Sequence, residues 1–427
     1  MKLDPAGNVH LTYCTNIHPG ETWPDVRASL ENYLPRAKAA LVPDDAFGMG
    51  LRLSAIAAND LAQPDALAEF KNFLQQQNLY VFTLNGFPYG DFHGTPVKEN
   101  VYLPDWRDNA RLNYTNQLAD ILVSLLPEGM DGSISTVPGA FKSLIMSDSD
   151  IAEIMENMVR HAAHLVDIHQ RTGKLISLTL EPEPCCFIET IDESVDFFET
   201  WLFSVAARDQ LMALTSLDAA GADAALHRHL GLCLDLCHAA VEFEEADAVI
   251  RKLDNAKINI GKMQISAGLR FAPVTDRTLE LLKPFDDAIY LHQTVANSNG
   301  NLTRHIDLQQ AFDAHTAGAS AEEWRVHFHV PIFLDDLGEF ATTQNFIREI
   351  LAIHRKKPIS NHLEVETYTW NVLPLEYRNV DVIDAIVREL NWVREQLASG
   401  AEGETIMSNT TRPLELMQEW LQKQLPD

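Results

Sequence analysis

Segment 231–238 contains residues that could do chemistry, and they alternate with leucines in the pattern of a β-strand. Leucines alternate there with Cys233, Asp235 and Cys237, and His238 follows directly. A period of two places the leucines on one face of a strand and the thiols and carboxylate on the other. A carboxylate and an imidazole where a strand opens into a loop are typical of the active-site mouth of a (β/α)8 barrel. The alternative is a buried strand end with a capping aspartate and a core histidine.

Three other segments, 174–184, 325–331 and 362–367, repeat this alternation of apolar and chemically active side chains. Their polar faces carry Glu181 and Glu183, His327 and His329, and Glu364 and Glu366. Side chains at i and i+2 project to one face, so a barrel would bring these acids and imidazoles together. Each segment alone is equally compatible with a half-exposed strand of an ordinary sheet. Carboxylates and imidazoles in all four segments favour one shared site.

Strand and helix patterns alternate along the chain, which indicates parallel βα units. The predicted strands are 10–15, 47–54, 80–84, 132–137, 175–181 and 231–235, and the predicted helices are 23–41, 64–77, 107–126, 149–171, 192–214 and 242–254. A closed barrel then needs two more strands, whereas 258–266, 288–293, 324–330 and 362–367 offer four. We therefore expect one α/β domain over 1–397, a (β/α)8 barrel with an insertion around 268–323. An amphipathic C-terminal helix is expected over 398–427.

The composition excludes some classes of protein. The 427 residues include 33 Lys and Arg against 61 Asp and Glu, a formal net charge of −28, which disfavours binding to nucleic acids or anionic membranes. No stretch approaches the ~20 apolar residues of a membrane span, and no secretory signal is visible. The five cysteines contain no Cys-x-x-Cys pair and are expected to be reduced: Cys14, Cys185, Cys186, Cys233 and Cys237. We expect a cytoplasmic protein and leave homo-oligomerisation open.

The motif Asp235-Leu-Cys-His238-Ala, with Glu181 one βα unit earlier and a glutamate on the last strand, resembles the xylose isomerase-like barrel superfamily. This superfamily contains sugar isomerases, epimerases and endonuclease IV. The chain also resembles the EboE-type metabolite traffic proteins over nearly its whole length. Four sequence segments carry this resemblance: 10–23, 47–54, 79–90 and 363–370. That family name describes a proposed role in exporting or processing a metabolite.

The superfamily resemblance implies a divalent metal, Mn²⁺, Mg²⁺, Zn²⁺ or Co²⁺. Its ligands would be Glu181, Asp235, a residue of the seventh strand and Glu364 of the eighth. The seventh-strand ligand has two candidates. Gln264 stands where the superfamily usually has histidine, and His329 lies 364 − 329 = 35 residues before Glu364, a suitable separation for adjacent barrel strands. We favour His329, because an amide is a poorer donor than imidazole.

Such a centre would polarise a carbonyl, and Glu183, Glu366 or His238 would move a proton on carbon. The expected substrate-binding residues are Asn85, Phe87, Tyr89, His93, His18, Trp23, His292 and His327. Aromatic walls with a few polar groups suit a sugar or cyclitol. We predict an isomerase, epimerase or dehydratase acting on a polyhydroxylated metabolite. The alternatives are a binding or traffic protein without turnover and, less favoured by the charge, an endonuclease IV-like phosphodiesterase.

Overall fold

Eight parallel strands form a barrel in the computed structural model, which describes residues 1–3, 7–90, 98–286, 289–368 and 381–398. In spatial order they are β1 (His10–Tyr13), β13 (His362–Val365), β7 (Ile260–Ile265), β6 (Leu230–Asp235), β5 (Ile176–Leu180), β4 (Gly132–Thr136), β3 (Leu79–Asn85) and β2 (Phe47–Arg52). A parallel bridge between Cys14 and Gly50 joins the two ends of this order. The predicted α/β class and (β/α)8 barrel are confirmed.

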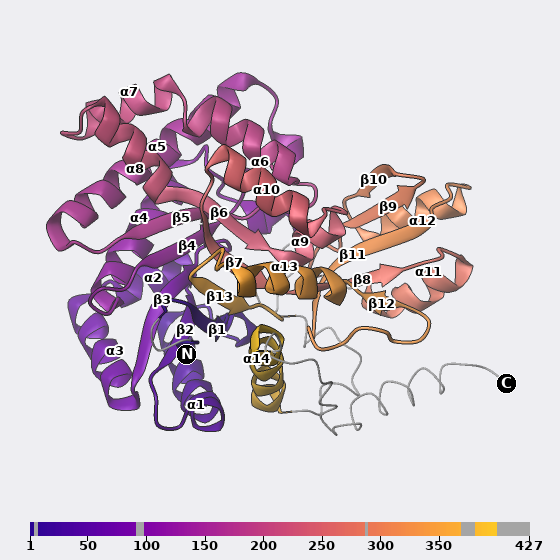
Figure 1. The fold of residues 1–427 in the computed structure, drawn as a ribbon, viewed down its shortest axis with the longest axis horizontal. Helices are drawn as coiled ribbons and strands as arrows, with labels where there is room; N and C mark the ends of the chain where they lie inside the picture. The colour runs from indigo at the N-terminus through magenta and orange to yellow at the C-terminus, as the bar shows by residue number, and fades with distance from the viewer. Residues whose placement is uncertain (4–6, 91–97, 287–288, 369–380, 399–427) are drawn as a thin grey trace.

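Helices surround the barrel (Figure 1). They are α1 (Trp23–Leu41), α2 (Ala55–Leu61), α3 (Pro64–Gln77), α4 (Asn109–Leu125), α5 (Asp148–Thr172), α6 (Ile191–Phe197), α7 (Val205–Leu214), α8 (Ala219–His229), α9 (Leu236–Val241), α10 (Ala246–Ala256), α13 (Gln344–Lys356) and α14 (Val382–Ala398). The predictions for α1 and α3 match their observed bounds. The predicted helix 192–214 is wrong as a single helix, because a π-helical turn separates α6 from α7 and Ser204 caps a new start. No helix within the described residues is long and apolar enough to span a membrane.

A second, antiparallel sheet is inserted between β7 and β13. Its order is β10 (Asn301–His305), β9 (Thr294–Ser298), β11 (Glu323–Val330), β8 (Ala267–Phe271) and β12 (Ala341–Thr342), and it is accompanied by α11 (Asp276–Leu282) and α12 (Leu308–Thr316). Figure 1 shows it in orange beside the barrel. We call it the inserted sheet. It begins near the predicted insertion but extends beyond Glu323 to include β11.

Two predictions for this region are wrong. The choice of His329 as the seventh-strand ligand placed the strand 324–330 in the barrel, whereas this strand lies in the inserted sheet. The seventh barrel strand is β7, which carries Gln264. The described part of the predicted strand 288–293 is irregular, and β9 starts at Thr294. Alternation cannot separate a barrel strand from a strand of an added sheet, because both have a period of two. The predicted C-terminal helix over 398–427 lies outside the described residues, apart from Ala398 at the end of α14.

Helix α14 buries an acidic side chain against the barrel. Glu389 is buried and accepts hydrogen bonds from the Thr367 hydroxyl at 2.7 Å and the Ile332 amide at 3.2 Å. Burial raises the pKa of Glu389 to about 7. Below the unfolded pKa, near 4.5, Glu389 is protonated in both states; as pH rises to about 7, only the unfolded state loses the proton. The stability that the protonated group contributes is therefore lost over this pH window.

We expect Glu389→Gln to be more stable than the wild type at pH 8, by up to roughly 3 kcal/mol, and similar to it near pH 4.5. The glutamine oxygen can accept both hydrogen bonds without ionising. Urea denaturation at the two pH values measures the effect. Glu395→Gln is the control, since Glu395 is exposed on the same helix. A variant that tracks the wild type at both pH values would contradict the prediction.

Candidate metal centre

Asp235 is held by the start of helix α9. Its Oδ1 accepts hydrogen bonds from the backbone amides of Cys237 (2.8 Å) and His238 (3.0 Å) and from the Ser266 hydroxyl (2.7 Å). Its Oδ2 is buried and has no hydrogen-bond partner among the described residues. The predicted loop at His238 is therefore the first turn of a helix. Capping of that helix orients one carboxylate oxygen and leaves the other directed at the neighbouring side chains.

Three carboxylates converge at the carboxyl ends of β5, β6 and β13. Glu181, Asp235 and Glu366 each offer an oxygen within 4.8 Å of the others, and all three are buried. Burial, with the neighbouring carboxylates, raises the pKa values of Glu181 and Glu366 well above the ordinary range. Glu181 Oε2, like Asp235 Oδ2, has no partner in the described structure. Buried carboxylates of this kind must either hold protons or share a cation.

Two asparagines orient Glu366 within this group. Its Oε1 accepts from Asn16 Nδ2 at 2.7 Å and from Asn85 Nδ2 at 3.0 Å. Its Oε2 lies 3.7 Å from Nδ1 of His329. Asn85, which was predicted to bind substrate, bonds to this candidate ligand and also lines the cavity described below. Asn16 was not predicted, since a single asparagine after a strand carries no distinctive pattern.

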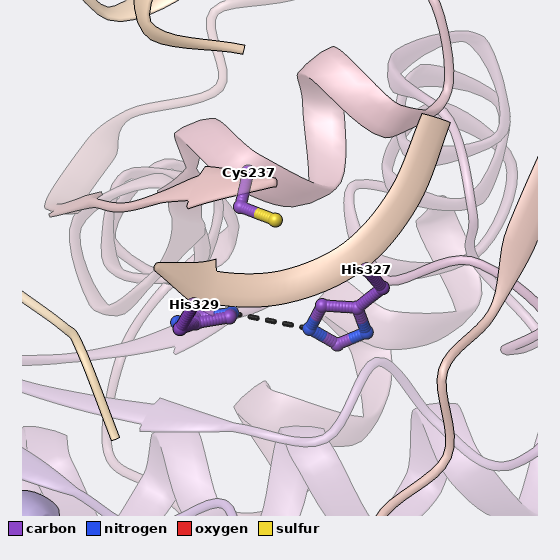
Figure 2. A group of neighbouring side chains, drawn as sticks. All are labelled: Cys237, His327 and His329. Carbon is purple, nitrogen blue, oxygen red and sulfur yellow. Dashed lines mark hydrogen bonds between the residues drawn. The ribbon is translucent and has the colours of Figure 1, made fainter. Parts of the chain in front are cut away.

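Three imidazoles meet beside the carboxylates, one from α9 and two from the inserted sheet. The Nε2 atom of His327 lies 3.1 Å from Nε2 of His238 and 3.1 Å from Nε2 of His329. Figure 2 shows the contact between the two histidines of β11. His329 Nε2 also lies 3.9 Å from Asp235 Oδ2. The inserted sheet thus completes a cluster that the barrel begins.

The partners of the Nδ1 atoms fix the tautomers of these imidazoles. In His238, Nδ1 bonds to the carbonyl oxygen of Pro182 (2.9 Å), and in His329 to that of Glu366 (3.0 Å). In His327 it bonds to the amide oxygen of Gln293 at 2.8 Å. Oxygens of this kind only accept, so each Nδ1 carries the proton and each Nε2 presents a lone pair. Burial lowers the pKa of all three histidines, which favours these neutral forms.

The lone pair of His327 fits a metal ion together with that of either neighbouring histidine. Zinc–nitrogen bonds of about 2.0–2.1 Å in a tetrahedral site place the nitrogens roughly 3.3 Å apart, close to the observed 3.1 Å contacts. Neutral imidazoles cannot satisfy one another in this arrangement, because none has a proton on Nε2. Imidazole suits Zn²⁺ and Co²⁺, whereas carboxylates suit Mg²⁺ and Mn²⁺. The residues present therefore fit one cation or two.

Cys237 lies against the same histidines (Figure 2). Its thiol donates to the carbonyl oxygen of Phe328 at 3.1 Å, and burial raises its pKa well above the ordinary thiol value. The protonated thiol thus has a partner of its own. In this state Cys237 packs β11 against α9.

Glu364, which was predicted as the last-strand ligand, lies one layer below the centre. It forms an ion pair with Lys262, with Nζ and Oε2 2.5 Å apart, and both side chains are fully buried. It belongs to none of the candidate ligand groups of the described residues, whereas Glu366 does. Two residues along a strand share a face but differ by about 6.6 Å in height, and this height decides which glutamate reaches the mouth. The Oε1 atom of Gln264 accepts from the Cys233 thiol at 3.0 Å, and its Nε2 atom has no partner among the described residues.

A cavity of about 60 Å³ opens above the centre. It is lined by Asn16, Asn85, Phe87, Pro88, Lys98, Val101, Tyr102, Glu181, Glu183, His238, Tyr290, Leu291, His327, His329, Glu366 and Tyr368. Glu183 faces this cavity, and its Oε1 accepts from the Tyr102 hydroxyl (2.7 Å) and from Gln293 Nε2 (2.9 Å). Burial raises the pKa of Glu183 to about 7. Tyr102 and Gln293 were not predicted as site residues, because both lie outside the four segments in which apolar and chemically active side chains alternate.

Several residues predicted to bind substrate do not line this cavity. His18 stacks on Tyr33 with ring centres 4.1 Å apart, and His292 stacks on Phe328 at 3.9 Å. Trp23 is buried in the core, and Tyr89 packs edge-on against Tyr114. Packing, the alternative to ligand contact for aromatic residues at a barrel mouth, accounts for their positions. His93 lies outside the described residues.

The fold and these donor groups define an α/β-barrel protein with a candidate divalent-metal centre at the carboxyl ends of its strands. No family model matches the chain, and no curated protein matches it. Among solved structures, a xylose isomerase-like TIM barrel protein from Mycobacterium smegmatis in complex with magnesium is similar at 12% identity and a TM-score of 0.47, over 92% of this chain and 96% of that one.

Two other solved structures show similar likeness. A xylose isomerase domain protein from Planctomyces limnophilus has 12% identity and a TM-score of 0.46, over 86% of this chain and 93% of that one. The IolI protein with a bound zinc atom has 14% identity and a TM-score of 0.43, over 93% of this chain and all of that one. At these identities and TM-scores, the likeness gives no information about the activity of this protein. The fold is assigned from the strand order of the barrel.

Proposed function

We propose that this protein is a divalent-metal-dependent enzyme that moves a proton on carbon in a small polyhydroxylated molecule, such as a sugar or cyclitol. One observation carries the proposal: three imidazoles and three carboxylates lie together, two of the carboxylates have an unpartnered oxygen, and all of these side chains except Asp235 line one cavity. His238, His327, His329 and Asp235 would hold the metal, together with Glu181 and Glu366. A bound divalent ion supplies Lewis acidity, which polarises a substrate carbonyl.

Glu183 is the proposed base. Its Oε1 is occupied by Tyr102 and Gln293, so the carboxylate has a defined orientation toward the cavity. Its pKa of about 7 lets it accept and return a proton near neutral pH. The three residues predicted to transfer protons, Glu183, Glu366 and His238, all belong to candidate ligand groups. We choose Glu183 because it lies outside the group of Glu181, Asp235 and Glu366, and because Tyr102 and Gln293 hold its Oε1 at the cavity.

The walls of the cavity suit a compact polar substrate. Phe87, Tyr290 and Tyr368 provide aromatic surface, and Lys98, paired with Asp307 at 2.6 Å, provides a cation. A space of this size admits a small metabolite only in part, so the polyol would present one edge to the centre. Isomerisation, epimerisation and dehydration can each begin with removal of a proton beside a carbonyl, and the proposal covers these proton-transfer routes.

Incubation in D₂O with Mn²⁺ or Zn²⁺ and a panel of ketoses, inososes and cyclitols tests the function. We expect stereospecific deuterium incorporation at carbon in at least one compound. Glu183→Gln should lower the exchange rate by about 100-fold or more with metal content unchanged, since positioned bases contribute that much. Glu189→Gln is the matched control, because Glu189 follows the same strand but pairs with Lys142.

A binding or traffic protein is the second candidate, and one observation favours it. Gln264 stands at the seventh strand, where the superfamily resemblance expects a histidine ligand. Binding of panel compounds without exchange, at high protein concentration, would reject the enzyme and support this candidate. An endonuclease-like activity remains disfavoured by the net charge of −28. The EboE-type assignment, cytoplasmic location and homo-oligomerisation stay predictions.

A further inference from the structure

Gln293 lies between the proposed base and the proposed metal ligands. It is buried, and it belongs to the segment that leads into β9 of the inserted sheet. Its Nε2 lies 2.9 Å from Glu183 Oε1 and 2.9 Å from the Tyr102 hydroxyl, and its Oε1 lies 2.8 Å from Nδ1 of His327. One side chain therefore contacts both halves of the candidate site.

The neighbours of Gln293 allow one orientation of its amide. A carboxylate only accepts, so the amide nitrogen must face Glu183. The amide oxygen then faces His327 and can only accept, which keeps the imidazole proton on Nδ1. The Nε2 lone pair of His327 is thereby directed at His238 and His329. A reversed amide would place its oxygen against the carboxylate oxygen of Glu183, so that two acceptors would meet without a proton between them.

We infer that Gln293 is a positioning residue that couples the proton-transfer group to the metal centre. Its oxygen selects the metal-binding tautomer of His327, and its nitrogen holds the Glu183 carboxylate directed at the cavity. This inference rests on the proposed function, the first role on its metal centre and the second on its proton transfer. The first role concerns metal affinity, which can be measured without any substrate.

Two substitutions separate the roles. Gln293→Met fills the space but neither donates nor accepts, so both roles are lost. Gln293→Glu keeps an acceptor for His327 but offers no N–H donor to Glu183, so only the hydrogen bond that directs Glu183 is lost. Gln344→Met is the matched control, since Gln344 is a fully buried glutamine whose amide bonds to Ile332 and Arg348, outside the centre.

The experiment measures Zn²⁺ affinity by competition with a chelating dye, thermal stability of the metal-free proteins, and deuterium exchange. Gln293→Met should bind Zn²⁺ about 10- to 100-fold more weakly than the wild type, the range for residues that orient metal ligands. Gln293→Glu should keep affinity within about threefold of the wild type, because a carboxylate also supports a ligand histidine. Both variants should lose at least about 90% of the exchange rate, and Gln344→Met should match the wild type in affinity and exchange.

A structural role alone would lower thermal stability equally in Gln293→Met and Gln344→Met and leave the affinity ranking flat, which would overturn the inference. Equal loss of affinity in both Gln293 variants would overturn the role of the oxygen. If the wild type binds Zn²⁺ but exchanges no substrate, the proposed function fails, while the affinity ranking still decides whether Gln293 positions His327.

Discussion

Replacing Lys262 with methionine is expected to lower the free energy of unfolding by about 3–5 kcal/mol, the range for removal of one partner from a buried ion pair. Lys262 and Glu364 are fully buried inside the barrel, with charged atoms 2.5 Å apart. Burial alone would lower the pKa of Lys262, but the carboxylate of Glu364 raises it above the ordinary lysine value. Without the ammonium group, Glu364 would remain as an uncompensated charge or take up a proton.

Urea denaturation of three variants checks this expectation. Lys262→Met should be the least stable, and Lys262→Met combined with Glu364→Gln should regain most of the loss, because no buried charge then remains. Gly50 makes room for this pair, since a Cβ atom there would lie 1.6 Å from Glu364 Oε1. A loss below about 1 kcal/mol in the single variant would show that the pair does not hold the barrel interior together.

Replacing Asp235 with asparagine is expected to weaken divalent-metal binding by at least about 100-fold, more than substitutions that only orient a ligand. The asparagine oxygen can keep the three hydrogen bonds to Cys237, His238 and Ser266, so α9 retains its cap. Its amide nitrogen replaces the unpartnered Oδ2 and offers donors where a cation needs an acceptor. The metal-free variant should therefore melt close to the metal-free wild type.

Metal content after dialysis and Zn²⁺ affinity measure this effect. Gln264→Ala is the control, because Gln264 pairs in register with Asp235 on the adjacent strand but its Oε1 already accepts from the Cys233 thiol. His329→Ala should fall between the two, with a loss of about 10-fold or more. Unchanged affinity in Asp235→Asn, or a larger loss in Gln264→Ala than in His329→Ala, would move the centre to the seventh strand.

Local pattern predicted much of the barrel and part of its site. The helix predicted over 23–41 is α1; in the structure Thr22 caps it and a proline stands in its first turn, and both act within one turn of the chain. Period-two alternation likewise placed His327 with His329 and Glu181 with Glu183 on common faces. These signals are carried by neighbouring residues, so they can be recognised without knowledge of the fold.

The sequence by itself determined which side chains share a face, and the tertiary structure decided which faces meet. Strand β11 alternates like a barrel strand, yet antiparallel pairing with β8 and β9 places it in the inserted sheet, from which its histidines reach His238. Glu364 and Glu366 share a face of their strand but lie at different heights in the closed barrel. Because of this difference, Glu364 forms an ion pair with Lys262, whereas Glu366 is a candidate metal ligand. Gln293 reaches Glu183 from 110 residues away in the chain. Contacts of this kind arise from loop closure and strand order, which no local period records.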